Sequence, residues 1–294
     1  MKSPVLSILF LLISVTLLAV PNDFRFRHFS VEDGLSSNSV RAIMQDKYGF
    51  LWIGTEEGLN RYDGIMIKSY SICPQAAGKY ISSLYGTKKN IWIGTDEGIY
   101  IYAYATETFT YFDLTTPNNV RITSIVNHIL QDKDGNLWFS TNGQGLFRYN
   151  LSKNYLEQYE FTSAFGIVAS TMADSDNQIW ALTNQGESGV YKLNKAENKF
   201  EPFGLLYNAG NHHSQALAML EDSEQTLWLG TWECGLQKID KYTRQTTTYL
   251  HPTDGKGVTH IHSLMEYAPH QLLIGSDDGL LLFNTLTEEY KLFT

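Results

Sequence analysis

The chain has little cysteine and little positive charge. It contains 2 cysteines, Cys73 and Cys234, in 294 residues. A disulfide scaffold needs more, so we expect two free thiols. Lys and Arg number 22 against 31 Asp and Glu, the formal net charge is −9, and no basic run occurs. An acidic chain without a basic cluster does not match a phosphate backbone. The sequence therefore predicts no nucleic-acid partner.

Motifs that carry catalysis are also missing. The chain has no G-x-S-x-G, no H-E-x-x-H and no G-x-x-x-x-G-K-[ST], which excludes the common hydrolase, zinc-protease and phosphate-binding signatures. The sialidase-type Asp box fails too, because Lys133 and Gln131 stand where its Asp and hydroxyl residue belong before Trp138. We expect no catalytic residue, no cofactor and no metal ion. A glycosidase with paired carboxylates remains an alternative.

Only one long hydrophobic run is present, from Val5 to Val20, and it follows Lys2. Its length is short of the roughly 20 residues that a membrane-spanning helix needs. A positive charge, a short apolar run and a small residue at its end are typical of a secretory signal peptide. We assign residues 1–20 to this signal, with cleavage after Ala19 or Val20, and residues 21–294 to one exported domain. The alternative is an uncleaved anchor, which would be the chain's one membrane contact.

A phrase containing tryptophan and glycine recurs along the whole domain. Its clearest copies are LWIGTEEGLNRYD from residue 51, IWIGTDEGIYIYA from 91 and LWLGTWECGLQKID from 227. The six anchor positions are Trp52, Trp92, Trp138, Trp180, Trp228 and Leu273. Their spacing of 40 to 48 residues is the period expected of β-propeller blades.

Each repeat predicts four antiparallel strands. The phrase itself is a hairpin, with a turn of two to five residues before the third strand. A short apolar strand precedes most phrases, and a strand with aromatic ends follows each one. The first strands include 40–45, 124–131, 216–220 and 261–265, and the fourth strands are 67–70, 109–112, 156–159, 199–203, 246–249 and 290–293. The sequence thus predicts an all-β propeller with six repeats.

Local residue types assign structural roles within each repeat. An Asp stands six residues before the Trp in four repeats, at Asp46, Asp132, Asp174 and Asp222. We expect this Asp to open a turn by accepting from downstream backbone N–H groups, and Gly49 and Gly135 to close it with positive φ. The tryptophans are expected to fill the space between adjacent blades.

The number of fourth strands raises a question about the ring. Residues 24–29, FRFRHF, have the pattern of a fourth strand but precede the first repeat. An N-terminal strand commonly closes a propeller by pairing with its last blade. Seven fourth strands and six sets of the other three predict an incomplete seven-bladed ring. A closed six-bladed ring, with residues 24–29 added to the last blade, is the alternative.

Residues 30–64, SVEDGLSSNSVRAIMQDKYGFLWIGTEEGLNRYDG, resemble the opening of the periplasmic sensor region of hybrid two-component systems. The later D-x-x-G-x-L-W and W-x-G-T-x-x-G-L phrases are similar to the two-component regulator propeller repeat of those sensors. The resemblance covers residues 24–294. It implies a periplasmic location and a domain that detects oligosaccharides released from glycans and drives signalling.

The same resemblance implies parts that these 294 residues do not contain. In that family two seven-bladed propellers precede an immunoglobulin-like domain, a membrane span, a histidine kinase, a receiver and a DNA-binding module. No second propeller, kinase histidine box or receiver is found here. We expect a fragment of a sensor, a truncated form or a stand-alone binder, and two unpaired blade faces would favour a homodimer.

Candidate ligand-binding residues come from the turns between second and third strands, which meet on one face of a propeller. They are Glu56, Asp96, Asn142, Gln144, Asn184, Trp232, Glu233, Asp277 and Asp278. Carboxylates and amides offer the donors and acceptors that neutral, hydroxyl-rich ligands need. The alternative is a solvated rim that keeps the turns soluble.

Trp232 is the candidate that breaks the repeat pattern, because other copies carry short polar residues in its place. Its indole is expected to stack on a sugar ring or to anchor a partner protein, unless it folds over the next blade. His260 and His262 are predicted to line the channel, and His212 and His213 to face solvent. Arg41 and Arg121 are expected in ion pairs. Three functions remain: a glycan-sensing propeller that binds an oligosaccharide or an adjacent sensor domain, a protein-interaction scaffold, and a carbohydrate-active enzyme.

Overall fold

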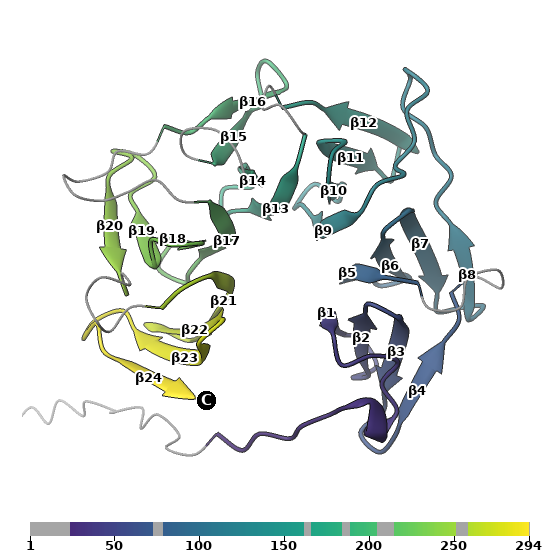
Figure 1. Cartoon of the computed structure of the whole chain (residues 1–294). Coiled ribbons are helices and arrows are strands. Elements are labelled where there is room, and N and C mark those ends of the chain that lie inside the picture. The colour runs from purple at the N-terminus through teal and green to yellow at the C-terminus, as the bar shows by residue number, and fades with distance from the viewer. Residues whose placement is uncertain are drawn as a thin grey trace, which may run out of the picture.

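The computed structural model describes residues 24–72, 79–161, 166–183, 189–204, 215–250 and 258–293. These residues form six four-stranded antiparallel sheets, arranged as the blades of a propeller around a common centre (Figure 1). A single turn of 3-10 helix, η1 (Val31–Asp33), precedes the first blade. The prediction of six four-stranded blades without α-helices is confirmed for the described part of the chain.

Within each blade the strands follow one another from the centre outwards. The two inner strands of blades 1 to 6 are β1 (Val40–Gln45) and β2 (Leu51–Thr55), β5 (Ile81–Gly86) and β6 (Asn90–Thr95), β9 (Val126–Gln131) and β10 (Leu137–Thr141), β13 (Val168–Ala173) and β14 (Ile179–Thr183), β17 (Ala216–Glu221) and β18 (Leu227–Thr231), and β21 (Ile261–Ala268) and β22 (Gln271–Ser276). The two outer strands are β3 (Gly58–Tyr62) and β4 (Ile67–Tyr70), β7 (Gly98–Ala103) and β8 (Thr108–Tyr111), β11 (Leu146–Asn150) and β12 (Tyr155–Tyr159), β15 (Val190–Asn194) and β16 (Lys199–Pro202), β19 (Leu236–Ile239) and β20 (Thr246–Tyr249), and β23 (Gly279–Asn284) and β24 (Tyr290–Phe293).

The recurring Asp does more than open a turn. Asp46 Oδ1 accepts from the backbone N–H groups of Tyr48 and Phe50, at 2.9 and 3.0 Å. Its other oxygen accepts from the indole Nε1 of Trp52 at 2.8 Å. Asp132, Asp174 and Asp222 bind the indoles of their own blades in the same way, at 2.8, 3.0 and 2.8 Å. The Asp therefore ties the first turn to the side chain that fills the blade junction, and Gly49 closes that turn with φ +88°.

Blade 2 lacks this bond. Its turn is one residue shorter, and Thr87 stands where the other four blades with an on-pattern tryptophan carry the Asp, so that Thr87 N donates to Asn90 O at 2.8 Å. The indole Nε1 of Trp92 is buried and has no hydrogen-bond partner among the described residues. A buried donor without an acceptor costs about 1–3 kcal/mol. Blade 2 thus carries the one on-pattern tryptophan with an unsatisfied indole.

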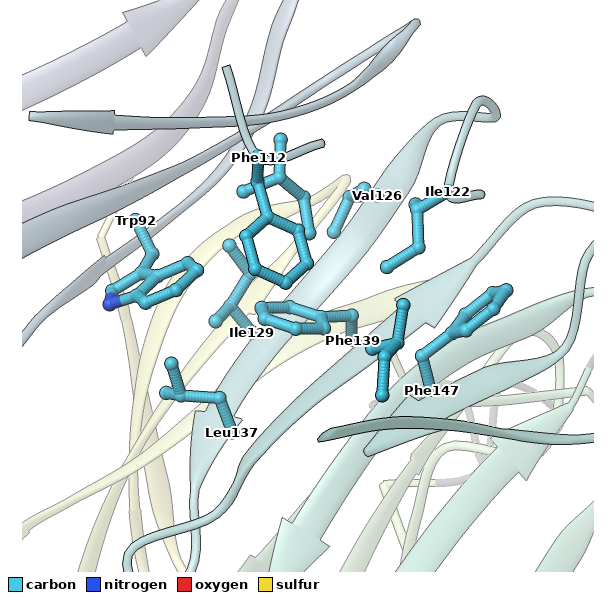
Figure 2. Close-up of a cluster of buried hydrophobic side chains, with 10 residues drawn as sticks. Trp92, Phe112, Ile122, Val126, Ile129, Leu137, Phe139 and Phe147 are labelled. Carbon is cyan, nitrogen blue, oxygen red and sulfur yellow. The ribbon is translucent and has the colours of Figure 1, made fainter. Parts of the chain in front are cut away.

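Each on-pattern tryptophan packs onto the next blade, as the sequence predicts. Figure 2 shows this for Trp92 of blade 2, which lies against Ile129, Leu137 and Phe139 of blade 3. The ring centroids of Trp92 and Phe139 are 5.7 Å apart. All five tryptophans are at most 3% exposed. The hydrophobic core is therefore divided among the junctions between blades, with apolar side chains from two blades in each cluster.

The ring is open between blade 6 and blade 1 (Figure 1). Inner strands of consecutive blades pack against each other from β1 to β21, whereas β21 and β1 flank the opening. Leu273 stands on β22 where the other blades have tryptophan, and it is half-buried. Met265, its partner on β21, is 53% exposed.

The opposite side of the opening shows the same loss of burial. Val40 begins β1, and its counterparts begin the inner strands of the other five blades: Ile81, Val126, Val168, Ala216 and Ile261. All five counterparts are 0% exposed, whereas Val40 is 46% exposed and Ile43, on the same strand, is 65% exposed. The two faces beside the opening are therefore the unpaired halves of a blade junction.

Residues 24–30, which we call the N-terminal strap, run across this opening without forming a strand (Figure 1). At one end the ring of Phe24 lies 5.0 Å from that of Phe293 on β24 and 5.6 Å from that of Tyr267 on β21. At the other end Arg27 donates to the hydroxyl of Tyr62 on β3 at 2.6 Å. The prediction that residues 24–29 form a fourth strand is wrong for this structure, because three partner strands are not present beside them.

Candidate functional site

The turns between second and third strands meet the entries to the inner strands on one face, here called the turn face. Backbone hydrogen bonds join them: Glu56 N donates to Ser39 O at 3.1 Å, and Trp232 N donates to Gln215 O at 2.9 Å. A glycine ends each turn. A Cβ on Gly235, where φ is +66°, would lie 2.5 Å from the carbonyl oxygen of Leu250, at the end of the fourth strand. At this turn a residue with a side chain would therefore clash with neighbouring backbone.

Most predicted ligand-binding side chains on this face already have partners within the chain. Glu56 is ion-paired with Arg41, and this hydrogen bond holds the pKa of the Glu56 carboxyl below its usual value. Gln144 folds onto the connection into blade 3, where its Oε1 accepts from Thr123 N at 2.9 Å and Ser124 N at 3.0 Å. The predicted ion pair of Arg41 is therefore present, and Gln144 has a structural role.

The remaining predicted residues of the first four blades are dispersed. Asp96 and Asn142 are exposed on separate turns. Arg121 is paired with Asp113 at 2.8 Å, as expected of it. Sequence reasoning missed the ion pair of Glu97 with the buried Lys79. Asn184, His212 and His213 lie outside the described residues.

Blades 5 and 6 bring four side chains together at one point of the turn face, here called the Trp232 cluster: Trp232, His260, His262 and Asp277. Trp232 comes from the β18–β19 turn, and its ring centroid lies 3.9 Å from that of His260 and 6.4 Å from that of His262. The backbone N–H of His260 donates to Trp232 O at 3.0 Å. Trp232 nevertheless keeps 39% of its surface exposed. The indole thus has both local packing and an accessible surface.

One carboxylate joins the two histidines of the cluster. Asp277 Oδ2 contacts His260 Nδ1 at 2.5 Å, and Asp277 Oδ1 contacts His262 Nε2 at 2.8 Å. These two hydrogen bonds, the one from His260 first, hold the pKa of Asp277 below its usual value. Asp278 accepts from Thr259 N at 2.9 Å, and Glu233 is exposed beside Trp232.

His260 and His262, which are expected to line the channel, are joined by Asp277, a carboxylate that the sequence did not indicate. Their two-residue spacing was the available signal. Asp277 lies far along the chain, but antiparallel pairing sets Ile261 opposite Ser276 and so places the turn of Asp277 beside both imidazoles. Within the described residues, no group of three or more His, Cys, Asp or Glu side chains is arranged to hold a metal ion.

The described cavities lie away from the Trp232 cluster. The largest of them, of about 510 Å³, is lined by the β17–β18 and β19–β20 turns of blade 5, with Glu224 and Tyr242, and by its outer strands, with Lys238. Those turns stand at the opposite strand ends from Trp232. The turn face therefore offers an open surface for a ligand, with an indole and two oriented imidazoles on it.

The repeats are similar in sequence to those of known proteins. Residues 34–57 and 120–143 match the family model of the two-component regulator propeller. These segments are two-component regulator propeller repeats. Among curated proteins the chain is similar to a histidine kinase P4 of Formosa agariphila, with 46% identity over 68 residues, which is 23% of this chain and 5% of that protein.

Solved structures share the propeller fold that these repeats build here. The extracellular domain of a putative hybrid two-component system of B. thetaiotaomicron has 23% identity and a TM-score of 0.74, over 91% of this chain and 36% of that one. Virginiamycin B lyase of Staphylococcus aureus has 14% identity and a TM-score of 0.68, over 86% of this chain and 83% of that one. The sensor and the lyase are alike in fold, so the fold alone does not assign a function.

The chain covers only part of the length of the proteins that it resembles. It spans about a third of the sensor domain that it resembles and a small part of the curated kinase. Within the residues that the structure describes, no helix has the length and apolar character needed to cross a bilayer. The predicted signal peptide, residues 1–20, lies outside the described residues.

Proposed function

We propose that this chain is the ligand-sensing propeller of a two-component regulator, exported to the periplasm, which binds an oligosaccharide or an adjacent sensor domain on its turn face without catalysis. The match of two blades to the two-component regulator propeller repeat supports this role. The extracellular location of the sensor domain with the same fold supports export. A leading segment with the pattern of a signal peptide agrees with both.

The observation that carries the binding site is the exposed indole of Trp232 in the Trp232 cluster. Aromatic rings stack on the C–H face of a sugar, while oriented polar groups take its hydroxyls. Glu233 follows Trp232 in the same turn, Asp277 contacts both imidazoles of the cluster, and Asp278 follows it, so these two turns supply carboxylate oxygens. Asn142 and Asp96 lie on other turns of the same face, and in this proposal they contact a longer ligand that extends round it.

The ring itself is proposed to be an incomplete seven-bladed propeller, because the exposed Val40 and Met265 occupy positions that are covered in the intact junctions. These same apolar faces favour a second candidate function, a scaffold on which a partner or a second copy of the chain docks. A docked partner would shield both side chains from solvent.

A thermal-shift screen of residues 21–294 against neutral oligosaccharides tests the binding role, with Trp232→Ala in parallel. We expect one class of sugar to raise the melting temperature of the wild type and to leave that of Trp232→Ala unchanged. A cooperative melt that no sugar shifts would reject the oligosaccharide. Size-exclusion chromatography then tests the scaffold, since a stable dimer would show that the faces beside the opening associate.

A further inference from the structure

The geometry of the Trp232 cluster fixes which nitrogen of each histidine carries a proton. Asp277 is ionised and accepts only, so both imidazoles must donate to it. His260 therefore carries its proton on Nδ1, and His262 carries its proton on Nε2. In the neutral ring the other nitrogen is then an acceptor. The lone pairs of His260 Nε2 and His262 Nδ1 are therefore left to accept a hydrogen bond from a ligand.

Both imidazoles are accessible, with 25% and 48% of the side-chain surface exposed for His260 and His262. They lie beside an indole that is itself 39% exposed. The cluster thus presents hydrogen-bond acceptors and a π-face at one place.

The charges around the cluster are negative. Asp277 and Asp278 are exposed, and neither is ion-paired with a lysine or arginine in the described part of the chain. Glu233 follows Trp232 directly. Carboxylates, acceptor nitrogens and an indole face are the groups that attract a cation with N–H donors. An anionic sugar would meet repulsion here, and a neutral sugar would gain no charge interaction.

We propose that Trp232, His260, His262 and Asp277 form a recognition site for a saccharide that bears a primary ammonium group. The ammonium lies over the exposed indole and donates to an imidazole nitrogen, while Asp277 holds both imidazoles in the accepting tautomer. This assignment rests on the proposed ligand-binding role of the turn face and names the chemical class of the ligand.

The test compares 6-amino-6-deoxyglucose with glucose, which differ by one ammonium group in place of one hydroxyl. Calorimetric titration of residues 21–294 at pH 8 gives both dissociation constants. We expect the amino sugar to bind about tenfold more tightly, the ratio typical of one exposed cation–π contact with a charge pair.

Asp277→Asn and Trp232→Ala are the test variants, and Glu57→Gln is the matched control. Glu57 is an exposed carboxylate on the equivalent turn of blade 1, without a histidine pair or an indole in its turn. The amino sugar should lose its advantage in the two test variants and keep it in the control. Retained melting temperatures in all three variants show that folding is not the cause.

Each other outcome is decisive. Equal binding of the two sugars overturns the ammonium assignment and leaves the proposed sugar-binding role in place. Equal loss in Glu57→Gln and Asp277→Asn also overturns it, because the effect is then one of net charge. If neither sugar binds, the assignment fails, and the screen of neutral oligosaccharides decides separately whether the proposed function fails with it.

Discussion

The five junctions between consecutive blades and the two faces beside the opening use the same positions of the repeat in opposite environments. In a junction the first residue of the inner strand is fully buried beneath the neighbouring blade, as Val126 is. Beside the opening the same position is Val40, which is 46% exposed. The first residue of the inner strand is apolar in both environments, but it is buried only in the junctions. An apolar residue at this position therefore indicates a surface that fits against another blade, even where no blade covers it.

The largest effect should come from placing a charge in each environment. Val126→Asp buries a carboxylate without a partner, and such a charge costs several kcal/mol at least, so we expect this variant not to fold cooperatively. Val40→Asp places the same carboxylate at a solvent-exposed position and should change the free energy of unfolding by less than about 0.5 kcal/mol. Urea unfolding followed by circular dichroism measures both. Equal destabilisation by the two changes would show that the ring closes in solution.

Truncation of the side chain at the tryptophan position tests the same comparison between a junction and the opening. Trp228→Ala leaves a cavity against Leu272, Ile274 and Phe283 of blade 6, and a buried tryptophan typically contributes 3–5 kcal/mol. Leu273→Ala removes the half-buried residue at the equivalent position of blade 6 and should destabilise by about 1–2 kcal/mol. Midpoints of urea denaturation for the pair give the comparison. A larger loss for Leu273→Ala would mean that its face is covered.

The bond between Asp and indole distinguishes one junction from another. Asp132→Ala leaves the buried Nε1 of Trp138 without its acceptor, as Trp92 already is, and should cost about 1–3 kcal/mol. In a Trp138→Phe background, which has no indole donor, the same change should cost less. A double-mutant cycle from urea unfolding yields this coupling energy. A coupling near zero would assign the role of Asp132 to its turn bonds with Asn136 alone.

A pH dependence separates a histidine inside a junction from those on the turn face. His128 on β9 faces Thr171 of blade 4, with Nδ1 at 3.4 Å from its hydroxyl, and burial lowers the pKa of His128 to about 4. Its charged form is disfavoured in the folded state, so stability is full above about pH 6.5 and falls as the pH drops towards 4. His128→Gln should flatten this part of the profile of unfolding free energy against pH. His262→Gln, on the turn face, should leave it in place.

The sequence predicted the blades well because each signal was local. Alternating apolar residues, the Asp that opens a turn and the glycine that ends one all act within a few residues, and strands 67–70, 246–249 and 290–293 begin and end as expected. The fourth strand at residues 24–29 failed because a strand needs partners, which no local pattern supplies. Trp232 was found as a break in the repeat.

The rest of the Trp232 cluster depended on register. His260 and His262 carried a visible spacing, but their partner Asp277 is brought in by the pairing of β21 with β22. Likewise the partner of Glu56 is Arg41 on the inner strand β1, and that of Glu97 is Lys79, just before the inner strand β5. The sequence correctly located the turns between second and third strands. It did not indicate which of their carboxylates are already paired within the chain.

The N-terminal strap has a consequence for how the molecule folds. Within the described blades, the core clusters join one blade to the next along the chain, so contact order is low and structure can spread from any blade to its neighbour. The strap is different, because Phe24 meets Phe293 and thereby closes a loop of nearly the whole domain. Closing a loop of that length is entropically unfavourable. We expect the strap to dock last during refolding and to exchange its amide hydrogens long before the blades do.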